Sequence, residues 1–90
     1  MPTVEEFKRE LIIVIGEAFN QGKKTVEISA GELHRRVGGY PGANHRMPVC
    51  CQVMRSEFDP ICDMILEEPP SGQGASLTIR YKLPHLVRDC

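Results

Sequence analysis

The chain has 90 residues, of which 41% are hydrophobic and 26% are charged, and its formal net charge is −1. This length and composition predict a single folded domain over residues 1–90, and they exclude a disordered chain or a second, cofactor-binding domain. The longest apolar run, Leu11 to Ile15, is far shorter than the roughly 20 residues that span a bilayer, and no signal peptide precedes it. We therefore expect a cytoplasmic protein that does not associate with membranes.

The N-terminal part of the chain predicts a helix followed by a strand. Thr3 and Glu6 have the spacing of a capping box, which marks the start of a helix. Hydrophobic residues then recur at the helical period until about Asn20. The next segment, Thr25 to Ser29, alternates between hydrophobic and polar residues over five positions, which is typical of a short strand.

A second helix is predicted directly after this strand. Ser29 and Glu32 form another capping box, so the helix begins at Ala30. It ends at Val37, because Gly38 provides the residue that a helix C-terminus favours. The connector that follows, GGYPGANHR from Gly38 to Arg46, is rich in turn-forming residues.

A third helix is predicted from Met47 to Phe58, because Pro48 suits the first turn of a helix and Pro60 ends it. Its hydrophobic residues face the core, and its polar residues lie on the opposite, solvent side. The outward residues are Gln52, Arg55 and Ser56. Two strands follow, at Met64–Glu67 and Leu77–Leu83, with the sequence PPSGQG between them as a hairpin tip.

Positive charge is concentrated in one stretch of the chain, from Leu33 to Ser56. This stretch contains four arginines and no acidic residue, and removing those four charges from the net charge of −1 leaves −5 for the rest. The arginines are Arg35, Arg36, Arg46 and Arg55, and His34 and His45 accompany them. Such a cluster favours a polyanionic partner, because each neutralised phosphate releases counterions. We expect the four arginines to share one exposed face; the alternative is that they only solvate the surface.

The order helix, strand, helix, helix, strand, strand resembles the winged helix-turn-helix family over nearly the whole chain. In that family the first helix braces the core, the next two form the helix-turn-helix, and the terminal hairpin is the wing, against which the short strand pairs. The resemblance implies an α+β, winged-helix-like domain with three helices and a small antiparallel sheet. It also implies a positioning helix at Ala30–Val37, a recognition helix at Met47–Phe58 and a wing tip at Ser71–Gly74.

The resemblance further implies that the recognition helix faces the major groove of double-stranded DNA. Gln and Arg side chains suit this role, because they can make paired hydrogen bonds to base edges. The candidate nucleic-acid-binding residues are Arg35, Arg36, Asn44, His45, Arg46, Gln52, Arg55 and Ser56. The implied function is that of a small, non-enzymatic DNA-binding or transcription-regulatory protein, and a homodimer of it could address two half-sites.

Two features depart from the family, and the second of them, an acidic wing, favours an alternative, a protein-interaction adaptor of the same fold that binds no nucleic acid. The connector between the paired helices has about nine residues, whereas the family usually has three or four. The wing also lacks positive charge, because Glu67 and Glu68 flank its base and no Lys or Arg lies between Glu68 and Arg80.

A second, fainter resemblance covers the block from Gly38 to Met54, GGYPGANHRMPVCCQVM. This block is similar to a segment of small uncharacterised bacterial proteins, some of which are carried on mobile gene cassettes. The similarity implies no activity. It indicates that the connector and the start of the third helix form a functional surface, whose polar members are Tyr40, Asn44, His45 and Arg46.

Metal binding and catalysis are weaker interpretations of the same sequence. The potential zinc ligands are His45, Cys50, Cys51, His85 and Cys90. They contain no Cys-x-x-Cys pair, and adjacent helical side chains point about 100° apart, so we expect no metal or other cofactor. His45 could act as a base for Cys50 or Cys51, but no carboxylate nearby in the sequence would orient it, and we expect no enzymatic activity. We expect the cysteines to be reduced.

Overall fold

The protein has an α+β fold with three helices and a small three-stranded antiparallel sheet. The computed structural model describes residues 3–38 and 46–84. Within these ranges the elements follow the predicted order of helix, strand, helix, helix, strand, strand. They are α1 (Val4–Asn20), β1 (Thr25–Ser29), α2 (Ala30–Val37), α3 (Met47–Ser56), β2 (Met64–Glu67) and β3 (Thr78–Lys82).

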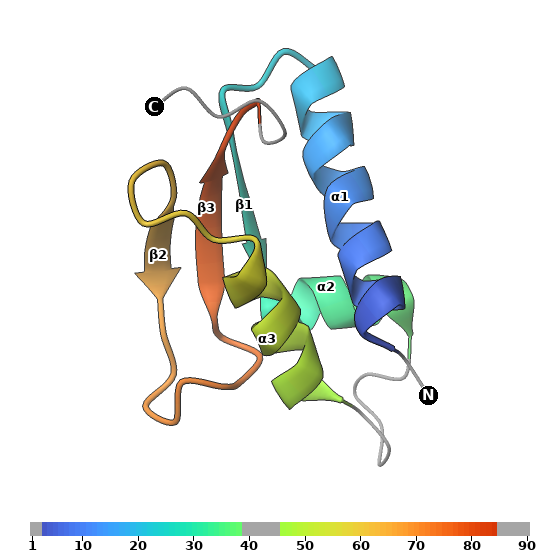
Figure 1. Cartoon of the computed structure of the whole chain (residues 1–90), viewed down its shortest axis with the longest axis vertical. Helices are drawn as coiled ribbons and strands as arrows, with labels where there is room; N and C mark the ends of the chain where they lie inside the picture. Colours follow the sequence, from blue (N-terminus) through green and yellow to red (C-terminus); the bar gives the residue numbers. More distant parts are fainter. Residues whose placement is uncertain (1–2, 39–45, 85–90) are drawn as a thin grey trace.

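The last strand in sequence is the central strand of the sheet, whose order is β1-β3-β2. Both β1 and β2 pair with β3 in antiparallel register, with Ile28 opposite Ile79 and Met64 opposite Arg80. The ladder between β2 and β3 shifts between Ile65 and Glu67. As a result β2 is a short and irregular edge strand, on the side of the sheet away from α1 (Figure 1).

The hydroxyl groups of both predicted capping boxes cap their helices, at the starts of α1 and α2. The Thr3 hydroxyl accepts a hydrogen bond from the backbone N–H of Glu6 at 3.2 Å, and the Ser29 hydroxyl accepts one from Glu32 at 3.2 Å. Because Ser29 is also the last residue of β1, the chain passes from strand to helix without a loop. The cap therefore fixes α2 relative to the sheet.

The core lies where the three helices meet one face of the sheet. Phe7 and Leu11 of α1 and Leu33 of α2 are fully buried. Tyr81 of β3 is also fully buried, and its hydroxyl donates a hydrogen bond to the backbone carbonyl of Met54 at 2.8 Å. This hydrogen bond satisfies the only polar group of the Tyr81 side chain, and it joins the central strand to the end of α3.

His34 completes the junction of the three helices. Its side chain is fully buried, and its Nε2 atom accepts a hydrogen bond from the backbone N–H of Arg46 at 2.8 Å. The ring of Phe7 packs edge-on against the imidazole, with 4.9 Å between the ring centroids. In the sequence His34 belongs to the basic stretch, which predicts a surface position. The structure places it in the core, where it contacts α1 and binds the residue that precedes α3.

Two elements are shorter than predicted. The third helix ends at Ser56 and not at Phe58, and the last strand covers Thr78–Lys82 and not Leu77–Leu83. The backbone N–H of Phe58 donates to the carbonyl of Arg55, which tightens the chain into a turn after α3. Phe58 lies beyond the helix and packs against the core.

Replacing His34 with Ala should lower the free energy of unfolding by about 2–4 kcal/mol. The substitution removes a buried ring and leaves the Arg46 N–H without its acceptor. Urea denaturation of both proteins measures the difference. Gln52→Ala is the matched control, because Gln52 is exposed and its loss should change stability by less than about 0.5 kcal/mol. Equal stabilities for His34→Ala and the parent would contradict the role given to this hydrogen bond.

Candidate nucleic-acid interface

The outer face of α3 is polar. It is the face that the sequence predicts to be exposed to solvent. Gln52 and Ser56 are exposed and lie one turn apart, whereas Cys50, Val53 and Met54 are buried. Gln52 projects its amide into solvent from the middle of the helix. The Ser56 hydroxyl donates a hydrogen bond to the carbonyl of Val53 at 2.7 Å, so its side chain lies close to the helix. Gln52 is thus the longest uncharged polar side chain on this face.

Arg55 lies on α3 but points toward the β2–β3 hairpin. Its Nη2 atom is 2.6 Å from a carboxylate oxygen of Glu68 and donates a hydrogen bond to the carbonyl of Gly72 at 2.8 Å. Gly72 has a φ of +79°, a conformation that glycine adopts readily. Arg55 therefore fastens the predicted wing tip to the predicted recognition helix, and its charge is largely compensated by Glu68.

Arg36 lies on α2 and is paired with α1. Its guanidinium is 3.2 Å from Glu10 and 3.5 Å from Glu17, both on α1. These two acids are seven residues apart and so lie on one side of the helix. The pairing compensates the charge of Arg36 and ties α2 against α1. This places Arg36 in a structural contact between two helices.

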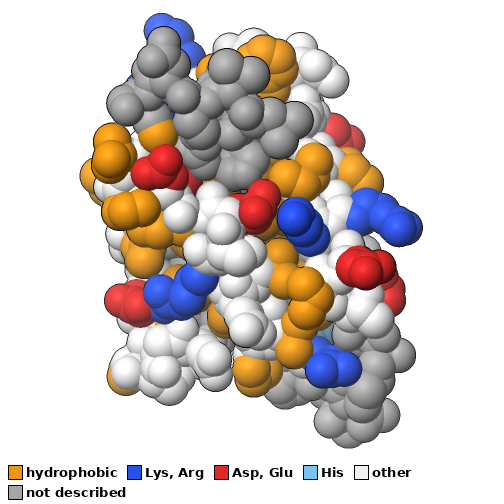
Figure 2. Space-filling model, in the orientation of Figure 1, with side chains coloured by type: hydrophobic (Ala, Val, Ile, Leu, Met, Phe, Trp, Pro, Cys, Tyr) orange, Lys and Arg blue, Asp and Glu red, His pale blue; other side chains and the backbone are white. Residues whose placement is uncertain are grey.

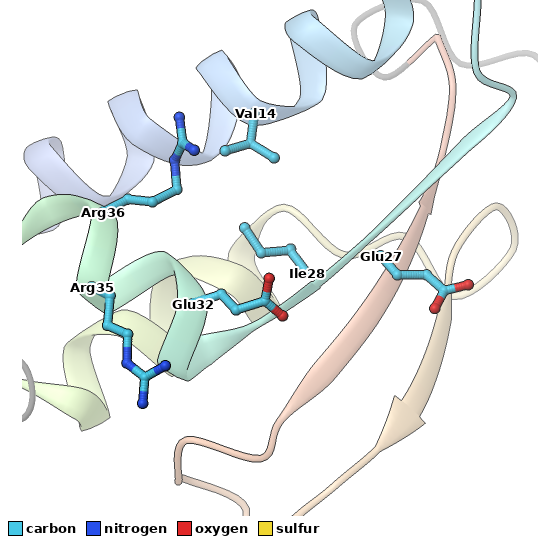
Figure 3. Close-up of a pocket in the computed structure, with 6 residues that line it drawn as sticks. All are labelled: Val14, Glu27, Ile28, Glu32, Arg35 and Arg36. Atoms are coloured by element: carbon cyan, nitrogen blue, oxygen red, sulfur yellow. The ribbon is translucent and has the colours of Figure 1, made fainter.

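Arg35 and Arg36 line a shallow groove of about 310 Å³ between α1, β1 and α2. Figure 3 shows Arg36 reaching toward α1 while Arg35 points away from it, and Glu32 extending to the side of both, toward Ile28. Val14 and Ile28 form the apolar walls, and Glu27 is at the rim. Because two acids and two arginines line it, the groove carries no surplus of positive charge.

Arg46 stands at the N-terminus of α3, where it is the N-cap residue and half-buried. No side chain caps this helix end. The backbone of Arg46 is held by His34, as described above. Two further predicted site residues, Asn44 and His45, lie outside the described residues.

The structure does not bring the four arginines onto one face. Arg35 and Arg36 lie at the groove beside α1 and β1, whereas Arg55 contacts the hairpin. Figure 2 shows acidic and basic side chains interleaved on the face drawn there, with no continuous basic patch. The expectation of a single basic face is therefore wrong. Arg46 and Arg55 are at the two ends of α3, the helix that carries Gln52 and Ser56.

The acids that pair with the arginines lie outside the basic stretch, so the charge of that stretch does not reveal them. Glu10 and Glu17 are on α1, before the basic stretch, and Glu68 is in the hairpin that follows the stretch. A signal was available for the first pair: two acids at heptad spacing on a helix whose other face is buried. The Arg55–Glu68 contact depends on the path of the hairpin relative to α3, and no local sequence pattern predicts this path.

Cys50 and Cys51 are buried free thiols. Burial, and secondarily the neighbouring Cys51, raise the pKa of Cys50 to about 12. Burial also raises the pKa of Cys51, and the nearby charge of Arg55 opposes this shift. These environments are those of packed thiols and not of activated nucleophiles. Cys62 is disulfide-bonded, which corrects the expectation that it is reduced.

The free energy of unfolding should fall as the pH rises above about 9. The folded protein keeps the Cys50 proton up to about pH 12, whereas the unfolded chain releases it near the ordinary value of 9.0. Unfolding therefore releases a proton in this range, and each pH unit costs about 1.4 kcal/mol of stability.

Urea denaturation at pH 8.5, 9.5 and 10.5 measures this dependence. Cys50→Ala is the comparison, because its slope above pH 9 should be shallower by about 1.4 kcal/mol per pH unit. Parallel slopes for the two proteins would contradict the assignment to Cys50.

The described part of the chain shows neither a metal-binding cluster nor a membrane-spanning helix. Residues 3–38 and 46–84 contain no group of three or more His, Cys, Asp or Glu side chains that could hold a metal ion. No helix among them has the length and apolar character needed to cross a membrane. Comparison with protein-family models, with curated proteins and with solved structures found no match to this chain.

Proposed function

We propose that this chain is a winged-helix-like domain that binds double-stranded DNA through α3, as a small non-enzymatic regulatory protein. The observation that carries the proposal is the combination of sheet topology and helix polarity. Strand β1 pairs with the terminal hairpin, as the short strand of a winged helix does. The helix that corresponds to the recognition helix exposes Gln52 along a polar face. A glutamine amide can pair with an adenine edge in the major groove.

The proposed DNA contact uses fewer arginines than the four in the basic stretch. Arg36 is engaged with two acids of α1, and Arg35 is at the groove beside β1. The phosphate contacts are therefore assigned to Arg46 and Arg55, at the two ends of α3. Arg55 can serve because its pairing with Glu68 is partly solvent-exposed, and such pairs contribute only about 0–1 kcal/mol.

Two phosphate contacts make a quantitative prediction about salt. The logarithm of the DNA affinity should fall with the logarithm of salt concentration at a slope of about −1.8, whereas four contacts would give about −3.6. Fluorescence anisotropy with a random-sequence duplex measures this slope. The double variant Arg46→Ala, Arg55→Ala should lose the binding, and Arg36→Ala should keep it. Loss of binding only in Arg36→Ala would contradict the assignment.

A second prediction concerns the competition between Glu68 and DNA for Arg55. Glu68→Gln should raise the affinity for the duplex by about two- to fivefold and leave the salt slope near about −1.8, because Arg55 contacts a phosphate in both proteins but no longer has to leave Glu68 to do so. Glu67→Gln is the matched control, since it removes the same charge from the neighbouring exposed residue. Equal gains in both variants would show a general charge effect and would contradict the specific competition.

The second candidate function is a protein-interaction adaptor of the same fold. Its support is the ion pairing of Arg36 and Arg55, together with a hairpin that carries Glu67 and Glu68 and no basic residue before Arg80. Phosphate repels such a wing, whereas a protein partner can accept it. Absence of DNA binding even at low salt would favour this candidate over the first.

A further inference from the structure

The side of the sheet formed by β2 carries an exposed apolar surface next to a groove. The groove has a volume of about 380 Å³ and lies between the start of β1, the end of β3 and the turn before β2. Its apolar lining includes Pro60, Ile61 and Met64. Ile61 is 79% exposed and Met64 is 56% exposed. Figure 2 shows hydrophobic side chains gathered along the side where Figure 1 places β2 and this turn.

The two ends of β2 differ in charge. At its start the groove is lined by Lys24, Arg80 and Lys82. Arg80 is paired with Glu27 at 3.1 Å. Asp63 also lines the groove, but it is buried, and its carboxylate accepts hydrogen bonds from the backbone N–H groups of Asp59 and Lys82. Lys24 and Lys82 are therefore the exposed charges that line this end. At one end of β2 there is thus a groove with basic and apolar side chains. At the other end one apolar and one acidic side chain, Leu66 and Glu67, are exposed.

We propose that a second copy of this chain docks here, with Leu66 and Glu67 of each copy entering the groove of the other. A two-fold rotation places the acidic end of one β2 against the basic end of its partner. Every favourable contact is then made twice, as in isologous dimers. The apolar side chains lie between the charged ends, where the contact excludes water. Surfaces of complementary charge also disfavour the opposite orientation.

The contact uses side chains and does not extend the sheet. Strand β2 has only four residues, and its pairing is irregular between Ile65 and Glu67. Bulges and short lengths at sheet edges prevent the addition of another strand. The proposed dimer is also independent of DNA binding, because none of its contact residues lies on α3. Failure of either proposal leaves the other standing.

Charge reversal tests the proposed dimer directly. In sedimentation equilibrium of the full chain, Lys82→Glu and Glu67→Lys should each raise the dimer dissociation constant by at least about tenfold, because each change places like charges together twice. The double variant Lys82→Glu, Glu67→Lys should return to within about threefold of the parent. Both side chains are exposed, so urea denaturation should show unchanged folding.

Lys23→Glu is the matched control. Lys23 is an exposed residue in the turn after α1, and it does not line the groove. Its reversal changes the net charge by the same amount and should leave the dissociation constant unchanged. A chain that stays monomeric at millimolar concentration, or a double variant no tighter than the single ones, would overturn the proposal.

Discussion

The arrangement of the three helices depends on one partly buried hydrogen bond, from the backbone N–H of Arg46 to the fully buried imidazole of His34. His34 is on α2, packs against Phe7 of α1, and holds the residue at which α3 begins. A buried polar group of this kind is costly to leave without a partner, so the bond restricts the positions that α3 can take. The direction of the polar face of α3 follows from this restriction.

Ion pairs account for the different positions of the arginines. Arg36 joins α2 to α1, and Arg55 joins α3 to the hairpin. Each pair is partly exposed and contributes little stability alone, but each determines where an arginine points. The chain therefore combines a strongly basic stretch of sequence with a surface on which the charges are balanced. An exposed pair such as Arg55–Glu68 can be exchanged for a contact with phosphate, which allows a structural arginine to serve in binding.

Local sequence patterns predicted the helices and strands. The positions of the candidate site residues depend on contacts between residues far apart in the sequence. The capping boxes at Thr3 and Ser29 located two helix starts correctly, because a cap involves only residues close in sequence. The inward and outward sides of α3 also followed from periodicity. The place of His34 in the core could not be predicted, because a histidine next to two arginines has the pattern of a basic surface. The partners of Arg36 and Arg55 come from other elements, and composition does not identify them.

The proposed DNA-binding function depends on contact between α3 and the duplex. The most direct test is a titration of the isotopically labelled chain with a short duplex, followed by amide chemical shifts in two-dimensional NMR. The account predicts that the largest changes occur at Gln52, Arg55 and Ser56 and at the N-terminus of α3. Changes confined to Ile61–Glu67, or no change at low salt, would contradict it.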